Sequence, residues 1–133
     1  MEKEFLNPAG MPSLPGFSQV VTATGGKLVF ISGQVAFNDK NELIGRGDLR
    51  AQAVQTFENL KTALAAVGAT FEDVLKTNIY IVNYQTDMLG MIRDVRSQYL
   101  PQDKAPASTL IGVQALALDG LLIEIEAIAM VKA

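Results

Sequence analysis

The amino-acid sequence predicts a single α+β domain in which two helices cover one face of a mixed β-sheet. Two amphipathic helical segments alternate with segments that carry the period-2 pattern of β-strands. The last strand-like segment is apolar on both faces, which is typical of a strand in the interior of a sheet. Because 133 residues suit one domain with its own core, we expect a single domain over residues 1–133.

The composition narrows the classes of function. Hydrophobic residues make up 49% of the chain and charged residues 19%, which favours a globular protein that buries surface against another subunit. Cysteine and histidine are absent, so thiolate nucleophiles, disulfides and zinc–thiolate sites are excluded. An acid or base must therefore be Asp, Glu, Lys or Tyr. We expect no metal, since no loop carries carboxylates at calcium-binding spacing.

Charge and hydropathy bear on partners and location. The net charge of −3 argues against nucleic acid as the main partner. No apolar run approaches the ~18 residues of a membrane span, and the N-terminus lacks the pattern of a signal peptide. We therefore expect a cytoplasmic protein without a membrane partner.

The first half of the chain predicts a loop, two strands and a long helix. Residues 1–17 carry three prolines and two glycines, which predicts a loop. Residues 18–24 and 27–33 read as strands, and the Gly25-Gly26 pair between them predicts a tight hairpin. Another short hairpin is expected within residues 35–44.

Capping residues bound the first helix. Asp48 is a good N-cap for a helix over residues 49–67, whose apolar residues recur every three or four positions. Gly68 stands where a helix C-terminus prefers glycine. The second half then predicts a strand over 74–82 and a helix over 88–99.

Residues 104–132 read as two extended segments joined at residues 118–120. In the second segment Glu124 and Glu126 share a face with apolar residues, about 6.6 Å apart along the strand. Carboxylates on such a face need partners, which makes them the first candidates for chemistry. Helices on one face leave the other sheet face bare, so we also expect the chain to self-associate.

Four segments together resemble the RidA/YjgF (L-PSP) family. They are SGQVAF at 32–37, residues 48–81, PAST at 106–109 and IEIEAIAM at 123–130, and the resemblance runs from about Gly16 onward. The resemblance implies a chorismate-mutase-like fold and a homotrimer whose sheets form a central barrel. It also implies small-molecule clefts between the subunits.

The resemblance further implies cofactor-free hydrolysis of reactive imine or enamine metabolites, such as 2-iminopropanoate, to a 2-keto acid and ammonia. One alternative is a non-catalytic member that binds or senses a small carboxylate-bearing or imine metabolite. A less favoured alternative is an endoribonuclease, against which the acidic charge and the absence of histidine count.

The family's site residues carry over only in part. Its catalytic glutamate corresponds to Glu124 and its cleft-lining serine to Ser32, which precedes Gly33. The family's tyrosine is replaced by Phe17, and its substrate-binding arginine by Ser108. The chain therefore resembles a divergent branch that lacks this arginine.

The remaining candidates have structural alternatives. Arg93 and Arg96 are either a solvated helix face or a relocated anion site, since Arg93 falls where many relatives have a polar cleft residue. Glu124 is either a ligand contact or a structural carboxylate, and Glu126 is expected to be structural. The Ser32-Gly33 pair is either a bulge in the sheet or a ligand contact.

Overall fold

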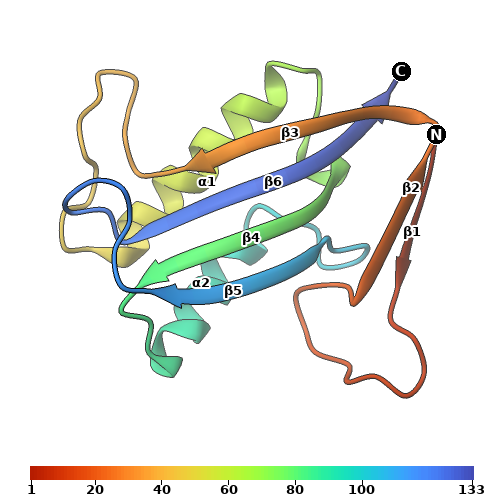
Figure 1. Cartoon of the computed structure of the whole chain (residues 1–133), viewed down its shortest axis with the longest axis horizontal. Helices are drawn as coiled ribbons and strands as arrows, with labels where there is room; N and C mark the ends of the chain where they lie inside the picture. The colour runs from red at the N-terminus through yellow and green to blue at the C-terminus, as the bar shows by residue number, and fades with distance from the viewer.

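Four strands form the main sheet in the computed structural model, which describes all 133 residues (Figure 1). Their order is β3-β6-β4-β5, with β6 in the interior as the sequence predicts. β4 and β5 are parallel, whereas β6 is antiparallel to both β3 and β4, so the sheet is mixed. The strands are β3 (Gly26–Gln34), β4 (Val74–Val82), β5 (Ala107–Val113) and β6 (Ile123–Lys132).

Both α-helices lie on the same face of this sheet (Figure 1). The first, α1 (Leu49–Ala65), begins as predicted, because the Asp48 side chain accepts a hydrogen bond from the Ala51 backbone N–H at 3.0 Å. The second, α2 (Leu89–Ser97), is shorter at both ends than the predicted 88–99, because Met88 belongs to a separate 3₁₀ turn, η2 (Thr86–Met88), and the helix ends at Ser97. The α+β prediction is therefore confirmed.

The core lies between the helices and the sheet. Alternate residues of β6 point into it, and the buried ones are Ile123, Ile125, Ala127, Ala129 and Val131. Phe57 of α1 is 1% exposed and stacks on Tyr99, with ring centroids 5.0 Å apart and planes 8° from parallel. Burial of each large apolar side chain contributes about 1.5–3 kcal/mol.

The N-terminal region differs from the prediction. The expected loop over residues 1–17 contains a strand, β1 (Glu2–Leu6), which pairs antiparallel with β2 (Val20–Thr24) in a separate two-stranded sheet. The predicted Gly25-Gly26 hairpin is wrong, because β2 pairs with β1 while β3 pairs with β6. Gly25, at φ +75°, turns the chain from one sheet into the other.

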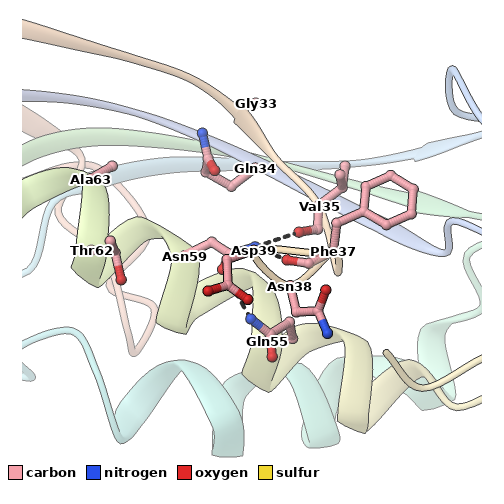
Figure 2. Close-up of a pocket in the computed structure, with 10 residues that line it drawn as sticks. All are labelled: Gly33, Gln34, Val35, Phe37, Asn38, Asp39, Gln55, Asn59, Thr62 and Ala63. Atoms are coloured by element: carbon pink, nitrogen blue, oxygen red, sulfur yellow. Dashed lines mark hydrogen bonds between the residues drawn. The ribbon is translucent and has the colours of Figure 1, made fainter. Parts of the chain in front are cut away.

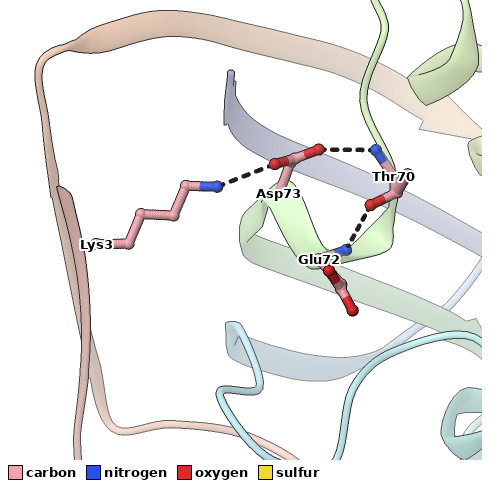
Figure 3. Close-up of polar contacts among 4 residues, drawn as sticks. All are labelled: Lys3, Thr70, Glu72 and Asp73. Carbon is pink, nitrogen blue, oxygen red and sulfur yellow. Dashed lines mark hydrogen bonds and ion pairs between the residues drawn. The ribbon is translucent and has the colours of Figure 1, made fainter. Parts of the chain in front are cut away.

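An ion pair joins the two-stranded sheet to the main domain (Figure 3). Lys3 Nζ lies 3.2 Å from Asp73 Oδ1, and Asp73 Oδ2 accepts a hydrogen bond from the Thr70 backbone N–H at 2.8 Å. Thr70 Oγ1 in turn accepts from the Glu72 backbone N–H, which completes a capping box for the 3₁₀ turn η1 (Phe71–Asp73). Asp73 therefore serves both the turn and the contact with β1.

The sheet face opposite the helices is covered by no helix (Figure 1). Large apolar side chains of β3 and β5 are exposed there: Phe30 at 73%, Leu28 at 52% and Ile111 at 45%. Large exposed apolar side chains of this kind favour a contact with another surface. None of the helices combines the length and the apolar composition that crossing a membrane requires.

Candidate functional site

An irregularity in β3 places Gly33 against Glu124. Ile31 pairs with Ala127, but Gln34 pairs with Ile125, so β3 has one residue more than β6 over this interval. The bulge interpretation of Ser32-Gly33 is thereby confirmed. A Cβ at residue 33 would overlap the Glu124 carboxylate, so a glycine is what permits this approach.

The two glutamates of β6 have different surroundings. Glu126 accepts a hydrogen bond from the Tyr80 hydroxyl, with an O···O distance of 2.5 Å. Glu124 lies beside Tyr80 in the register and is half-buried, and no group of the chain donates a hydrogen bond to its carboxylate. Glu126 thus has a structural partner, whereas Glu124 has its hydrogen-bonding capacity free for a ligand or water.

The pKa of Tyr80 is raised by the two carboxylates near it. The largest cause of the rise above 10.0 is the hydrogen bond to Glu126, and burial and the negative charges of Glu126 and Glu124 raise the pKa further. The tyrosinate form is disfavoured because it would stand beside two carboxylates. Tyr80 is therefore a neutral donor at physiological pH.

A buried glutamine fixes the beginning of β6. Gln52 of α1 is 0% exposed, and its Nε2 donates to the Gly45 carbonyl at 3.1 Å and to the Gly120 carbonyl at 2.9 Å. Its Oε1 accepts from the Leu122 backbone N–H at 2.8 Å. Because Leu122 is two residues before Glu124, this amide determines where the strand that carries the carboxylate starts.

A cavity of about 730 Å³ opens where β3 ends against α1 (Figure 2). Gly33, the neighbour of Glu124, is one of the residues that line it. Asn59 Nδ2 donates to the carbonyls of Val35 and Phe37, both at 2.8 Å, and Gln55 donates to Asn59 at 2.9 Å. These amides hold the segment after β3 onto the helix. Their role was not predicted from the sequence, where Gln55 and Asn59 look like part of a solvated helix face.

The other predicted site residues form a second group at the start of β5. Ser18 donates its backbone N–H to the Pro106 carbonyl at 3.1 Å, which places the half-buried Phe17 beside this strand. Ser108 accepts a hydrogen bond from the hydroxyl of Thr77, which is 2% exposed, at 3.0 Å. Ser108 therefore faces the helix layer.

Ser108 and Glu124 lie apart within one chain. Ser108 pairs with Thr77 and Glu124 pairs with Tyr80, so they are two strand spacings and three residues apart. These offsets correspond to roughly 14 Å between Cα atoms, with the side chains on opposite faces. Within one chain, Gly33 of the Ser32-Gly33 bulge thus lies beside Glu124. Phe17 and Ser108 lie apart from this pair.

The two arginines of α2 do not share one environment. Arg93 is exposed, whereas Arg96 is 6% exposed and lies against Gly16 of the loop that joins β1 to β2 (residues 7–19), here called the N-terminal loop. For Arg96 the solvated-face alternative is therefore wrong. The chain has no cluster of three or more acidic side chains that could hold a metal ion.

Comparisons with known proteins agree with one another. A sequence model described as Endoribonuclease L-PSP matches residues 9–131. A Yersinia pestis protein of unknown function from the conserved Rid family, YyfB, has a crystal structure that superposes with a TM-score of 0.91. It is 44% identical, and the match covers 98% of this chain and 100% of that one.

Two relatives add sequence similarity over most of the chain. A 2-iminobutanoate/2-iminopropanoate deaminase of Dermatophagoides farinae is 34% identical over 116 residues, which cover 87% of this chain and 86% of that protein. A RutC family protein of Pyrococcus horikoshii is 35% identical over 113 residues, which cover 85% of each chain.

Proposed function

Since this chain belongs to the endoribonuclease L-PSP family, the RidA/YjgF proteins, we propose that it hydrolyses small reactive imines or enamines. The substrate class is that of 2-iminopropanoate, and the products are a 2-keto acid and ammonia. The observation that carries the proposal is the half-buried carboxylate of Glu124, which has no partner in the chain and lies against Gly33. The similarity to a 2-iminobutanoate/2-iminopropanoate deaminase supports the same reaction.

The chemistry needs one base that can also return a proton. Glu124 accepts a proton from a water molecule as the water oxygen adds to the C=N carbon, and its carboxyl group returns that proton to the imine nitrogen, which gives a carbinolamine. Glu124 then takes the hydroxyl proton of the carbinolamine and passes it to the amino nitrogen, so that the C=O bond forms as the C–N bond breaks and ammonia leaves. Every atom comes from the imine and water, so the proposed reaction uses no cofactor.

We place the reaction in a cleft between subunits of a homotrimer. The exposed Phe30, Leu28 and Ile111 on the uncovered sheet face favour association through that face. The separation of Ser108 from Glu124 supports a site to which two chains contribute, since one chain leaves the two residues on opposite faces. The cytoplasmic location expected from the sequence stays a prediction.

The test is the rate of keto-acid release from 2-iminopropanoate, generated in situ by an amino-acid oxidase. We expect the wild-type protein to accelerate release above the spontaneous rate, and Glu124→Gln to remove most of the acceleration. Glu4→Gln is the matched control, because Glu4 is an exposed carboxylate on β1. No acceleration by the wild-type protein would overturn the deaminase proposal.

A second candidate function is non-catalytic binding of a small metabolite in the same cleft. The observation that favours it is Ser108, a neutral residue bonded to Thr77 where the family has its substrate-binding arginine. A charge-assisted hydrogen bond contributes roughly 1.5–3 kcal/mol, which a neutral serine does not replace. Binding of pyruvate that Glu124→Gln alters, without turnover of the imine, would select this candidate over hydrolysis.

A further inference from the structure

Arg96 is an unusual residue for the position that it occupies. Its side chain leaves α2 toward the N-terminal loop, and the residue is only 6% exposed. A buried guanidinium is costly unless an anion compensates its charge, because burial removes it from water. The surroundings of Arg96 therefore indicate what it binds.

No carboxylate of the chain pairs with Arg96. The two ion pairs of the protein join Lys3 to Asp73 and Arg50 to Asp94. Asp94, although two residues from Arg96 in sequence, is directed to α1, where its Oδ2 lies 2.9 Å from Arg50 Nη1.

The charged neighbour of Arg96 has the same sign. Arg93 lies one helical turn earlier, and burial, followed by the charge of Arg93, lowers the pKa of Arg96 below its usual value. Two cations side by side with no anion leave a local excess of positive charge in a protein whose net charge is −3. An external anion would relieve both the repulsion and the desolvation.

The two arginines line a small cavity of about 60 Å³ together with Pro15, Gly16 and Gln102. Gly16 has φ +90°, and a Cβ there would overlap Arg96 Nη2, so the glycine lets the loop pass directly over the guanidinium. The volume equals that of about two water molecules, at roughly 30 Å³ each. This space suits one carboxylate or phosphate group.

We propose that Arg96 and Arg93 form a binding site for a small oxyanion, a carboxylate or an inorganic phosphate, beneath the N-terminal loop at Gly16. The planar guanidinium of Arg96 presents paired N–H donors, the geometry that either anion recognises. Arg93 supplies a second charge from the exposed side of the cavity. The site goes beyond the proposed function, because it requires neither Glu124 nor catalysis.

Isothermal titration of the full-length protein with sodium pyruvate, and separately with inorganic phosphate, tests the proposal at low ionic strength. We expect saturable binding of at least one anion. Binding of pyruvate would identify the ligand as a carboxylate, and binding of inorganic phosphate would identify it as a phosphate. Arg93→Gln should weaken binding about tenfold or more, as should Arg96→Met. Arg50→Gln is the control, since Arg50 is an exposed arginine that is bound to Asp94.

Because Arg96→Met removes a buried residue, the exposed Arg93→Gln variant keeps the test independent of folding. In an NMR titration the backbone amides of Gly16 and Gln102 should shift with the same saturation curve. Absence of saturable binding of both anions to the wild-type protein would overturn the proposal. Binding that Arg93→Gln and Arg96→Met leave unchanged would overturn it equally.

Discussion

Gly33 lies so close to Glu124 that a methyl group at residue 33 would overlap the Glu124 carboxylate. The contact exists because the bulge after Ile31 turns the end of β3 over β6. The carboxylate thereby lies directly against the backbone of residue 33. The position of Glu124 should then depend on the absence of a side chain at residue 33.

Gly33→Ala should displace the Glu124 carboxylate and lower the rate of imine hydrolysis about 100-fold, since a shift of about 1 Å has that effect. Crowding should also destabilise the protein by about 1–3 kcal/mol in urea unfolding. The control is Gly90→Ala in α2, where a Cβ meets nothing within 4 Å. That variant should be neutral, or more stable by up to about 1 kcal/mol. Equal activities of the two variants would contradict the positioning role of Gly33.

Gln52→Leu should lower the free energy of unfolding by at least about 3 kcal/mol, because three backbone partners lose their hydrogen bonds. Chemical denaturation measures the change. Gln98→Leu, at an exposed position just after α2, should change stability by less than about 0.5 kcal/mol. A loss below about 1 kcal/mol in Gln52→Leu would mean that water replaces the amide.

Tyr80 should ionise above pH 10.0, because Glu126 and Glu124 disfavour the tyrosinate. Its pKa is higher in the folded than in the unfolded state, so the stabilisation is complete below pH 10.0 and is lost as pH rises through the folded pKa. Near-ultraviolet titration of the wild-type protein and Tyr80→Phe isolates this hydroxyl. Glu126→Gln should lower the Tyr80 pKa, and an unchanged value would contradict the role of the hydrogen bond.

The Tyr99 hydroxyl should also ionise at a higher pH than a free tyrosine. Its pKa is raised to about 12, chiefly by burial and secondly by the hydrogen bond that its hydroxyl donates to Glu58 Oε2 at 2.7 Å. The contribution of the Tyr99 hydroxyl to the free energy of unfolding is fully present below pH 10.0 and is lost as pH rises through about 12. Tyr99→Phe keeps the stack on Phe57 and should cost about 1 kcal/mol or less, because Glu58 is exposed. Phe57→Ala should cost about 3–5 kcal/mol.

Phe30→Asp should disrupt the proposed trimer, because it places a charge at the most exposed apolar side chain of the uncovered sheet face. Light scattering should then change from about 43 kDa, three times the chain mass of 14.3 kDa, to that of one chain. Val67→Asp is the control, since Val67 is 39% exposed beyond the C-terminus of α1. A wild-type protein that is itself monomeric would contradict the trimer.

The sequence by itself determined the elements whose signals are local. Alternation along residues 121–131 predicted an interior strand, and Asp48 predicted the first residue of α1. The order of the motifs identified the family, and the absence of cysteine and histidine limited the chemistry to carboxylates, lysine and tyrosine. The strand alternation and the helix cap depend on residues within a few positions of one another, for which side-chain periodicity and capping are sufficient guides.

Only the tertiary structure decided which distant residues meet. It paired β2 with β1 rather than with β3, because β3 forms its own ladder with β6. It bonded Glu126 to Tyr80 and left Glu124 free, although both carboxylates share one face of one strand. It also buried Arg96 beneath Gly16, eighty residues away in sequence. Such contacts follow from strand register and helix packing over the whole chain, which no local pattern encodes.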